Sequence, residues 1–159
     1  MSTLEVKSIA APAGYTLAMP SGHILQTVQA TYGTRVVSSA DTFIDTGLTG
    51  TITPSSTSNK ILVTVSQMGL DKRTNNAYMY LTLLNGSSVI YTPNAQLLYT
   101  ANTNGNSGSC TFSYLDSPSS TSAVTYKTQF KSVSGNAQVS VQWNGAAATS
   151  TITLMEIAG

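Results

Sequence analysis

Apolar and polar residues alternate with a period of two along much of this chain, a pattern typical of β-strands with one dry and one wet face. The clearest segment is 124–131, whose apolar-leaning face carries Val124, Tyr126, Thr128 and Phe130. Residues 110–114 alternate in the same way, with Cys110, Phe112 and Tyr114 on one face. The polar stretch between these two segments contains Pro118, which has no N–H to donate to a sheet. We therefore predict a β-hairpin over residues 110–132, around which the rest of the fold packs.

Other segments repeat this composition, and turn-forming residues separate them every 8 to 12 positions. Asn85-Gly86 is the strongest of the hairpin turns, because both residues tolerate positive φ. No segment has the period of a helix. About nine or ten short strands predict an all-β fold, an antiparallel β-sandwich with a jelly roll as the favoured form. Besides those above, the predicted strands are residues 23–32, 48–53, 60–70, 77–84, 88–92, 137–143 and 150–157, with shorter pieces at 35–37 and 43–44.

The chain divides into an extended N-terminal docking arm, residues 1–22, and a β-sandwich domain, residues 23–159. The arm has too little apolar surface to fold alone, and it is interrupted by Pro12 and Pro20. In the domain, Ile24 and Val28 are the expected apolar anchors of the first strand. In segment 137–143, the alternation predicts an inward face of Val139, Val141 and Trp143 and an outward face of Gln138, Ser140 and Gln142.

Segment 77–84 is apolar or aromatic on both faces, so a sandwich core can cover only one of them. The second face carries Tyr78 and Tyr80. Buried tyrosine suits a subunit interface, since the ring provides area and the hydroxyl keeps a polar contact. The alternative is that the polar segment 93–108 folds over these two rings.

Composition restricts the function. Only 8% of the residues are charged, whereas Ser and Thr together make up 46 of 159. The net charge of +1 argues against nucleic-acid binding, which requires clustered Lys and Arg. No apolar run approaches 18 residues, so we expect no membrane insertion, and we identify no signal peptide.

The sequence contains no arrangement expected of an enzyme. His23 is the only histidine and Cys110 the only cysteine, so a catalytic triad and a zinc site both lack the necessary residues. Cys110 is expected to be a buried apolar residue. Trp143, the only tryptophan, is either a core residue or an exposed ring that stacks on a sugar. We predict no catalytic residues, no metal and no cofactor.

Several segments together resemble a family of small virion structural proteins of tailed bacteriophages, described as tail-fibre or tail-fibre-like. They are MSTLEVKSI, PSGHILQTVQ, ITPSSTSNKILVTV, YLDSPSSTSAVTYKTQF and STITLMEIAG, in this order, and they span nearly the whole chain. The resemblance implies a jelly-roll domain that forms a homotrimer and is displayed on the virion after synthesis in the host cytoplasm. It provides no catalytic residues. Because only about 22 residues precede the domain, we expect a short knob rather than a long fibre.

The resulting hypothesis is a non-enzymatic trimeric knob with Tyr78 and Tyr80 at its interface. Its arm would dock on other virion proteins, and its polar loops would face outward, where they could bind host-surface glycan. The alternatives are a capsid decoration or cement protein of the same fold and, less favoured, a glycan depolymerase. The loop residues proposed for binding are Lys72, Arg73, Asn75, Asn102, Asn104 and Asn144.

Overall fold

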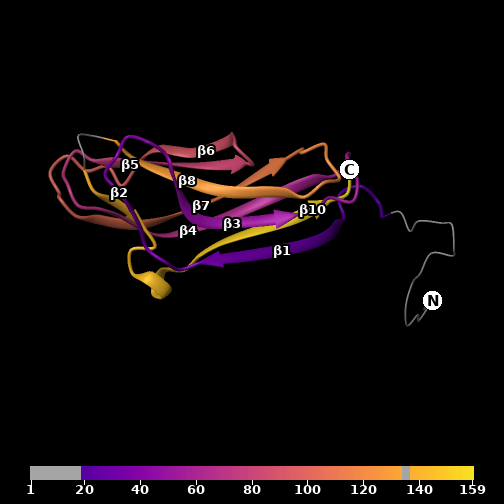
Figure 1. Cartoon of the computed structure of the whole chain (residues 1–159), viewed down its shortest axis with the longest axis horizontal. Helices are drawn as coiled ribbons and strands as arrows, with labels where there is room; N and C mark the ends of the chain where they lie inside the picture. The colour runs from indigo at the N-terminus through magenta and orange to yellow at the C-terminus, as the bar shows by residue number, and fades with distance from the viewer. Residues whose placement is uncertain (1–18, 134–136) are drawn as a thin grey trace, which may run out of the picture.

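The computed structural model describes residues 19–133 and 137–159 and consists of two antiparallel β-sheets packed face to face (Figure 1). A short 3-10 helix, η1 (Gly145–Ala148), precedes the last strand. Within the described ranges, no helix is long and apolar enough to cross a membrane. The strands are β1 (Ile24–Tyr32), β2 (Val36–Ser38), β3 (Ile44–Ile52), β4 (Lys60–Lys72), β5 (Tyr78–Asn85), β6 (Ser88–Leu97), β7 (Asn106–Asp116), β8 (Val124–Val133), β9 (Val139–Val141) and β10 (Ser150–Ile157).

The strand order is that of a jelly roll. Sheet A runs β1-β10-β4-β9-β2, with β7 also paired to β4, and sheet B runs β3-β8-β5-β6. When the short strands β2 and β9 are left aside, sheet A holds the first, eighth, third and sixth long strands. Sheet B holds the second, seventh, fourth and fifth. The predicted fold class is therefore confirmed. Most of the predicted arm, residues 1–18, lies outside the described part of the chain.

The predicted hairpin over residues 110–132 is wrong. β7 pairs with β4 in sheet A, whereas β8 pairs with β3 and β5 in sheet B. The segment between them, which contains Pro118, crosses from one sheet to the other. The predicted dry faces are nevertheless right: Val124, Tyr126 and Phe130 are buried, and Phe112 is largely buried. Alternation specifies which face is dry, and two facing sheets satisfy it as well as two paired strands do.

Several strands are longer than predicted, and β3 and β6 change the picture most. The predicted segments 43–44 and 48–53 merge into the single strand β3, without Phe43 and Thr53, and a register shift between Asp45 and Thr49 surrounds Gly47. Gly47 has φ 86°, and the ring of Tyr32 occupies the position that a Cβ atom would need. β6 continues through Pro93, which a strand at the edge of a sheet tolerates. The predicted long segment 93–108 is thereby reduced to residues 98–105.

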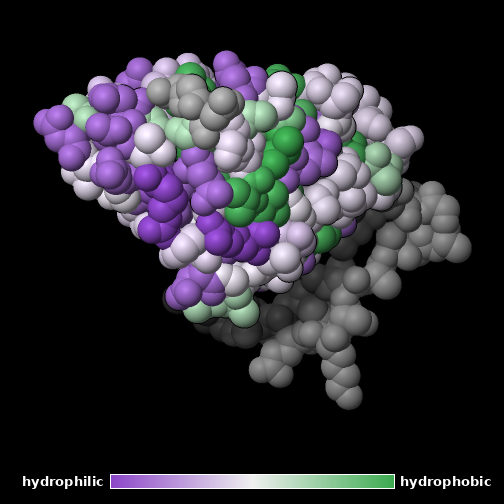
Figure 2. Space-filling model, turned by 60° about the vertical axis from the view of Figure 1, so that its left-hand side comes forward, coloured by the Kyte–Doolittle hydropathy of each residue, from purple (hydrophilic) through white to green (hydrophobic). Residues whose placement is uncertain are grey.

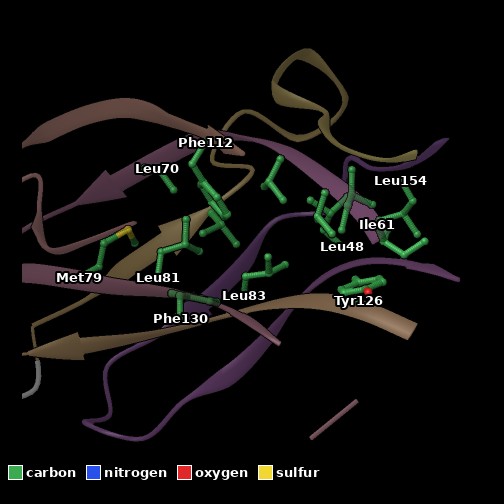
Figure 3. Close-up of a cluster of buried hydrophobic side chains, with 14 of the residues drawn as sticks. Leu48, Ile61, Leu70, Met79, Leu81, Leu83, Phe112, Tyr126, Phe130 and Leu154 are labelled. Atoms are coloured by element: carbon green, nitrogen blue, oxygen red, sulfur yellow. The ribbon is translucent and has the colours of Figure 1, made fainter. Parts of the chain in front are cut away.

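The core lies between the two sheets (Figure 3). Sheet A provides Ile61 and Leu154, and sheet B provides Leu81, Leu83 and Phe130, all of them with no exposed surface. The hairpin predicted at Asn85-Gly86 is confirmed, but its connecting residues are Gly86 and Ser87: Asn85 closes β5, and of the predicted pair only Gly86 has positive φ, 59°.

Segment 137–143 departs from its predicted faces. Val139 and Val141 are buried as expected, but Ser140 and Gln142 are also buried, and 38% of Trp143 is exposed. Gln142 has φ 49°, so the alternation of the strand ends before the tryptophan. Ile24 is likewise no anchor of the core. It is 57% exposed because the register of β1 shifts directly after it.

A chain of hydrogen-bonded polar side chains crosses the apolar core. The Thr46 and Thr128 hydroxyls lie 2.6 Å apart in sheet B, and Thr128 Oγ1 donates to Gln67 Oε1 in sheet A at 2.9 Å. Gln67 Nε2 then donates to Ser150 Oγ at 3.0 Å, which the Gln142 amide also contacts at 2.9 Å. All five side chains are buried. Such a chain favours one alignment of the two sheets, because any slip leaves buried polar groups unpaired.

Candidate functional site

The two ends of the sandwich differ in what they carry (Figure 1). At one end, which we name the proximal end, the two termini of the domain meet: Gly22 N–H donates to the Ala158 carbonyl and Ala158 N–H to that of His23, both at 2.8 Å. The other end, the distal end, includes the connections 73–77, 98–105 and 142–149, together with residues 33–35 and 39–43 on either side of β2, whereas residues 53–59, 86–87 and 117–123 connect strands at the proximal end. The chain therefore enters and leaves at the pole opposite to its distal loops.

A buried carboxylate organises the proximal end. Glu156 is 1% exposed, and its Oε1 accepts hydrogen bonds from Asn59 Nδ2 at 2.6 Å and from the Ser55 N–H and hydroxyl at 2.6 and 2.8 Å. Its Oε2 accepts from Gln26 Nε2 at 2.6 Å. Asn59 in turn accepts a bond from the N–H of Gly159. This carboxylate cluster, Gln26, Ser55, Asn59 and Glu156, ties β1, the β3–β4 connection and β10 to the end of the chain.

Hydrogen bonding sets the ionisation of Glu156. Burial alone would raise the pKa of this carboxyl, because it disfavours the charged form. The bonds from Asn59, Gln26 and Ser55 outweigh burial and lower the pKa below its usual value. Among the described residues, the cluster holds this negative charge by hydrogen bonds from neutral groups, without an ion pair.

Lys72 is the corresponding buried group of the distal end. We predicted an outward-facing loop residue, and this is wrong: Lys72 closes β4 and has no exposed surface. Its Nζ lies within hydrogen-bonding distance of Thr74 O, Thr100 O, Thr100 Oγ1 and Thr103 O. Burial lowers the pKa of this amine. The ammonium group holds loops 73–77 and 98–105 together through neutral oxygen atoms.

Replacing Lys72 by methionine should loosen the distal loops without unfolding the sandwich. The partly buried oxygen acceptors of Thr74, Thr100 and Thr103 would lose their donor, which we expect to lower the free energy of unfolding by roughly 1–3 kcal/mol. Hydrogen exchange over residues 98–105 should accelerate. Lys60→Met, at the exposed other end of the same strand, is the matched control. Unchanged exchange in Lys72→Met would contradict the anchoring role.

Arg73 and Trp143 form the exposed centre of the distal end together with Arg35. The guanidinium carbons of Arg73 and Arg35 lie 3.8 and 4.0 Å from the centroid of the Trp143 ring. Two groups at this distance would collide on one face, so they must stack on opposite faces of the indole. Arg73 Nε also pairs with Asp71 Oδ2 at 2.7 Å. We name this arrangement the Arg–Trp–Arg stack. It leaves neither face of the ring free for a sugar, and Trp143 is too exposed for a core residue, so neither of the two roles considered for it holds.

The sequence drew attention to Arg73 and Trp143 but missed Arg35. Arg35 stands alone in the sequence and reaches the stack because it directly precedes β2, which pairs with β9 just before Trp143. No local pattern indicates this. The other loop residues proposed for binding are exposed and lie at the distal end, whose surface is mainly hydrophilic around a compact apolar group (Figure 2). They are Asn75, Asn102, Asn104 and Asn144.

Tyr78 and Tyr80 lie half-buried on the outer face of sheet B. Their ring centroids are 5.9 Å apart, and Tyr99 from loop 98–105 meets Tyr78 edge-on at 6.1 Å. Lys131 Nζ lies 5.2 Å from the Tyr80 centroid. Tyr99 therefore covers part of Tyr78, as expected if segment 93–108 folds over the two tyrosines. A subunit contact at Tyr78 and Tyr80 stays a prediction.

The residues with reactive side chains lie apart from one another. Burial raises the pKa of the Cys110 thiol, and Nδ1 of the exposed His23 lies 3.1 Å from the Pro20 carbonyl oxygen. The described part of the chain has no group of three His, Cys, Asp or Glu that could hold a metal ion. A hollow of about 150 Å³ opens beside β3, but Asp45 and Lys127, which line it, pair with each other at 2.9 Å.

Comparison with known proteins relates the fold, though not the sequence, to viral particles. No family model matches the chain, and no curated protein matches it. The structure of the Gx strain of infectious bursal disease virus aligns with 97% of this chain, at 13% identity and a TM-score of 0.51. The VP2 subviral particle of the same virus aligns equally far, at 13% identity and a TM-score of 0.50. The chain spans 37% and 38% of those proteins. At this identity the likeness shows a shared fold.

Proposed function

We propose that this protein is a non-enzymatic structural component of a virion, held through its proximal end and presenting its distal end outward. The observation that carries the proposal is the polarity of the jelly roll: both domain termini meet at one pole, and loops 73–77, 98–105 and 142–149 lie at the other. The shared fold with viral particles and a surface rich in hydroxyl groups support it. The resemblance to tail-fibre-like proteins of tailed bacteriophages favours a trimeric knob on the particle surface. Its N-terminal arm would dock on other virion proteins.

The oligomeric state tests the knob directly. We expect the purified protein to have a mass of roughly three times 16.6 kDa by light scattering after size exclusion, and to remain a trimer, of correspondingly lower mass, without residues 2–20. Tyr78→Glu and Tyr80→Glu should give monomers, because each places a charge in the proposed contact. Thr111→Glu, on the exposed outer face of sheet A, is the control. A monomeric wild-type protein would contradict the proposed trimer. If both tyrosine variants remain trimers, the subunit interface does not include Tyr78 and Tyr80.

A capsid decoration protein is the second candidate, since the fold is equally compatible with clamping shell subunits. Labelled antibody against the protein, applied to intact particles, distinguishes the two. Label on the tail supports the tail-fibre type, and label on the head supports decoration. Absence of label from the particle would overturn both.

The state of the carboxylates supports a non-enzymatic role over a glycan depolymerase. Glycosidases use two carboxyl groups that flank the bond to be cleaved. Each carboxylate in the described ranges already pairs with a cation or accepts hydrogen bonds: Asp41 with Lys131, Asp45 with Lys127, Asp71 with Arg73, Asp116 with Tyr126 and Glu156 with its cluster. An assay for reducing ends released from host polysaccharide tests this, and turnover would overturn the non-enzymatic role.

A further inference from the structure

The distal end concentrates the unbalanced positive charge of the domain. Three cationic side chains lie there, Arg35, Lys72 and Arg73, with Asp71 as the carboxylate among them. Asp71 is occupied on both oxygens, by Arg73 Nε and by the Ser107 hydroxyl at 2.7 Å. On the outer face of sheet B, in contrast, each lysine has an acid of its own: Lys127 pairs with Asp45 at 2.9 Å and Lys131 with Asp41 at 2.7 Å.

Arg35 has no anionic partner in the described part of the chain. Its guanidinium group makes a cation–π contact with the Trp143 ring, and its Nε is buried without a hydrogen bond to the described residues. Arg73 uses Nε for Asp71, while 42% of its side chain remains exposed. The indole fixes both guanidinium planes and thereby reduces the entropy that two arginines would lose on binding. A guanidinium group that is fixed in this way, with unused N–H donors, is suited to bidentate recognition of a carboxylate.

The surroundings favour a carbohydrate as the carrier of that carboxylate. Both faces of Trp143 are taken, so a neutral sugar has no ring to stack on at this point. Asn144 directly follows the tryptophan and is exposed, and the same loop ends at the exposed Thr149, whose hydroxyl donates to the Ala146 carbonyl at 2.8 Å. Amide and hydroxyl groups of this kind exchange hydrogen bonds with sugar hydroxyls.

We propose that the Arg–Trp–Arg stack binds the carboxylate groups of an acidic, uronate-bearing surface polysaccharide. This inference rests on the proposed function, which directs the distal end away from the particle. It replaces an unspecified glycan by a charged class and names Arg35 and Arg73 as the residues that recognise it. Recognition by charge implies weaker binding at higher ionic strength.

Trp143 provides the measurement, because it is the only tryptophan and its ring carries both arginines. The full-length protein is titrated with tetragalacturonate while tryptophan emission is recorded. Maltotetraose serves as a neutral probe of equal length and a glutamate-rich decapeptide as an acidic probe of another class. We expect a saturable change with tetragalacturonate that weakens with added salt, and none with maltotetraose.

The variants separate local recognition from overall charge. Arg35→Met and Arg73→Met should each weaken tetragalacturonate binding at least tenfold, whereas Lys60→Met, with the same loss of charge at the proximal end, should change it less than twofold. Arg35→Lys should fall between, since lysine keeps the charge and loses the planar fork. Arg35→Met is the decisive variant because Arg35 makes no ion pair in the described chain. Thermal unfolding of each variant verifies the fold.

Several results would overturn the inference. These are no saturation with tetragalacturonate, equal losses in Arg35→Met and Lys60→Met, or binding of maltotetraose at similar affinity. If the decapeptide binds more tightly than tetragalacturonate, the partner of the Arg–Trp–Arg stack is an acidic protein and not a polysaccharide. None of these outcomes affects the virion assignment, which is decided by the antibody label on particles and by the oligomeric mass.

Discussion

Replacing Glu156 by leucine is expected to lower the free energy of unfolding by about 3–5 kcal/mol, the range for removing one partner from a buried charged network. The side chain is 1% exposed, and four hydrogen bonds from Gln26, Ser55 and Asn59 end on it. Leucine is similar in size, so the main cost is the loss of the acceptor for these buried donors. Urea unfolding at neutral pH, followed by circular dichroism, measures the difference.

Glu156→Gln is the companion variant, because it keeps one acceptor and removes the charge. We expect a loss of roughly 1–2 kcal/mol at pH 7, which should shrink on acidification. The hydrogen bonds lower the pKa of Glu156 in the folded state, so the unfolded chain binds the proton more readily. The stabilisation by the charge is therefore complete above the ordinary glutamate pKa and is lost as the pH falls through the lower, folded-state pKa. A difference between wild type and Glu156→Gln that does not change between pH 7 and pH 3 would contradict this account.

Gln67→Leu is expected to cost about 2–4 kcal/mol, although it adds an apolar side chain to an apolar core. Gln67 links the Thr128 hydroxyl of sheet B to the Ser150 hydroxyl of sheet A, and all three side chains are buried. Leucine removes the acceptor of one group and a donor to the other, which leaves desolvated polar atoms without full partners. Urea unfolding of the variant measures the cost.

A double-mutant cycle with Thr128→Val determines whether this cost comes from the hydrogen bond. Removing both partners leaves fewer unpaired groups than removing either, so the double variant should be more stable than the sum of the single losses predicts, by about 1–2 kcal/mol. Gln138→Leu makes the same chemical change at an exposed position and should stay within about 0.5 kcal/mol of wild type. Strict additivity of Gln67→Leu and Thr128→Val would show that the polar chain does not act as a unit.

The sequence by itself determined the strands, the dry face of most of them and the fold class. Period-two alternation is a local property, and burial of one face follows from it: Ile61, Val63 and Val65 of β4 and Val124, Tyr126 and Phe130 of β8 are all buried. Turn residues are equally local, and Gly86 adopts the positive φ that its hairpin needs. The same reasoning could have located Glu156, since it continues the inward face of Ile152 and Leu154 in β10.

Only the tertiary structure decided which strands pair and which distant side chains meet. The pattern in residues 110–132 is the same whether the two strands are neighbours in one sheet or lie in opposite sheets, because either arrangement buries the same face. Lys72 lies in a polar stretch of sequence, yet its ammonium group is buried by oxygen atoms from a loop 28 to 31 residues away. Arg35, Arg73 and Trp143 meet because β2, β9 and β4 adjoin at the distal end. Long-range contacts of this kind depend on how the two sheets stack. The local periodicity of the sequence contains no information about this stacking.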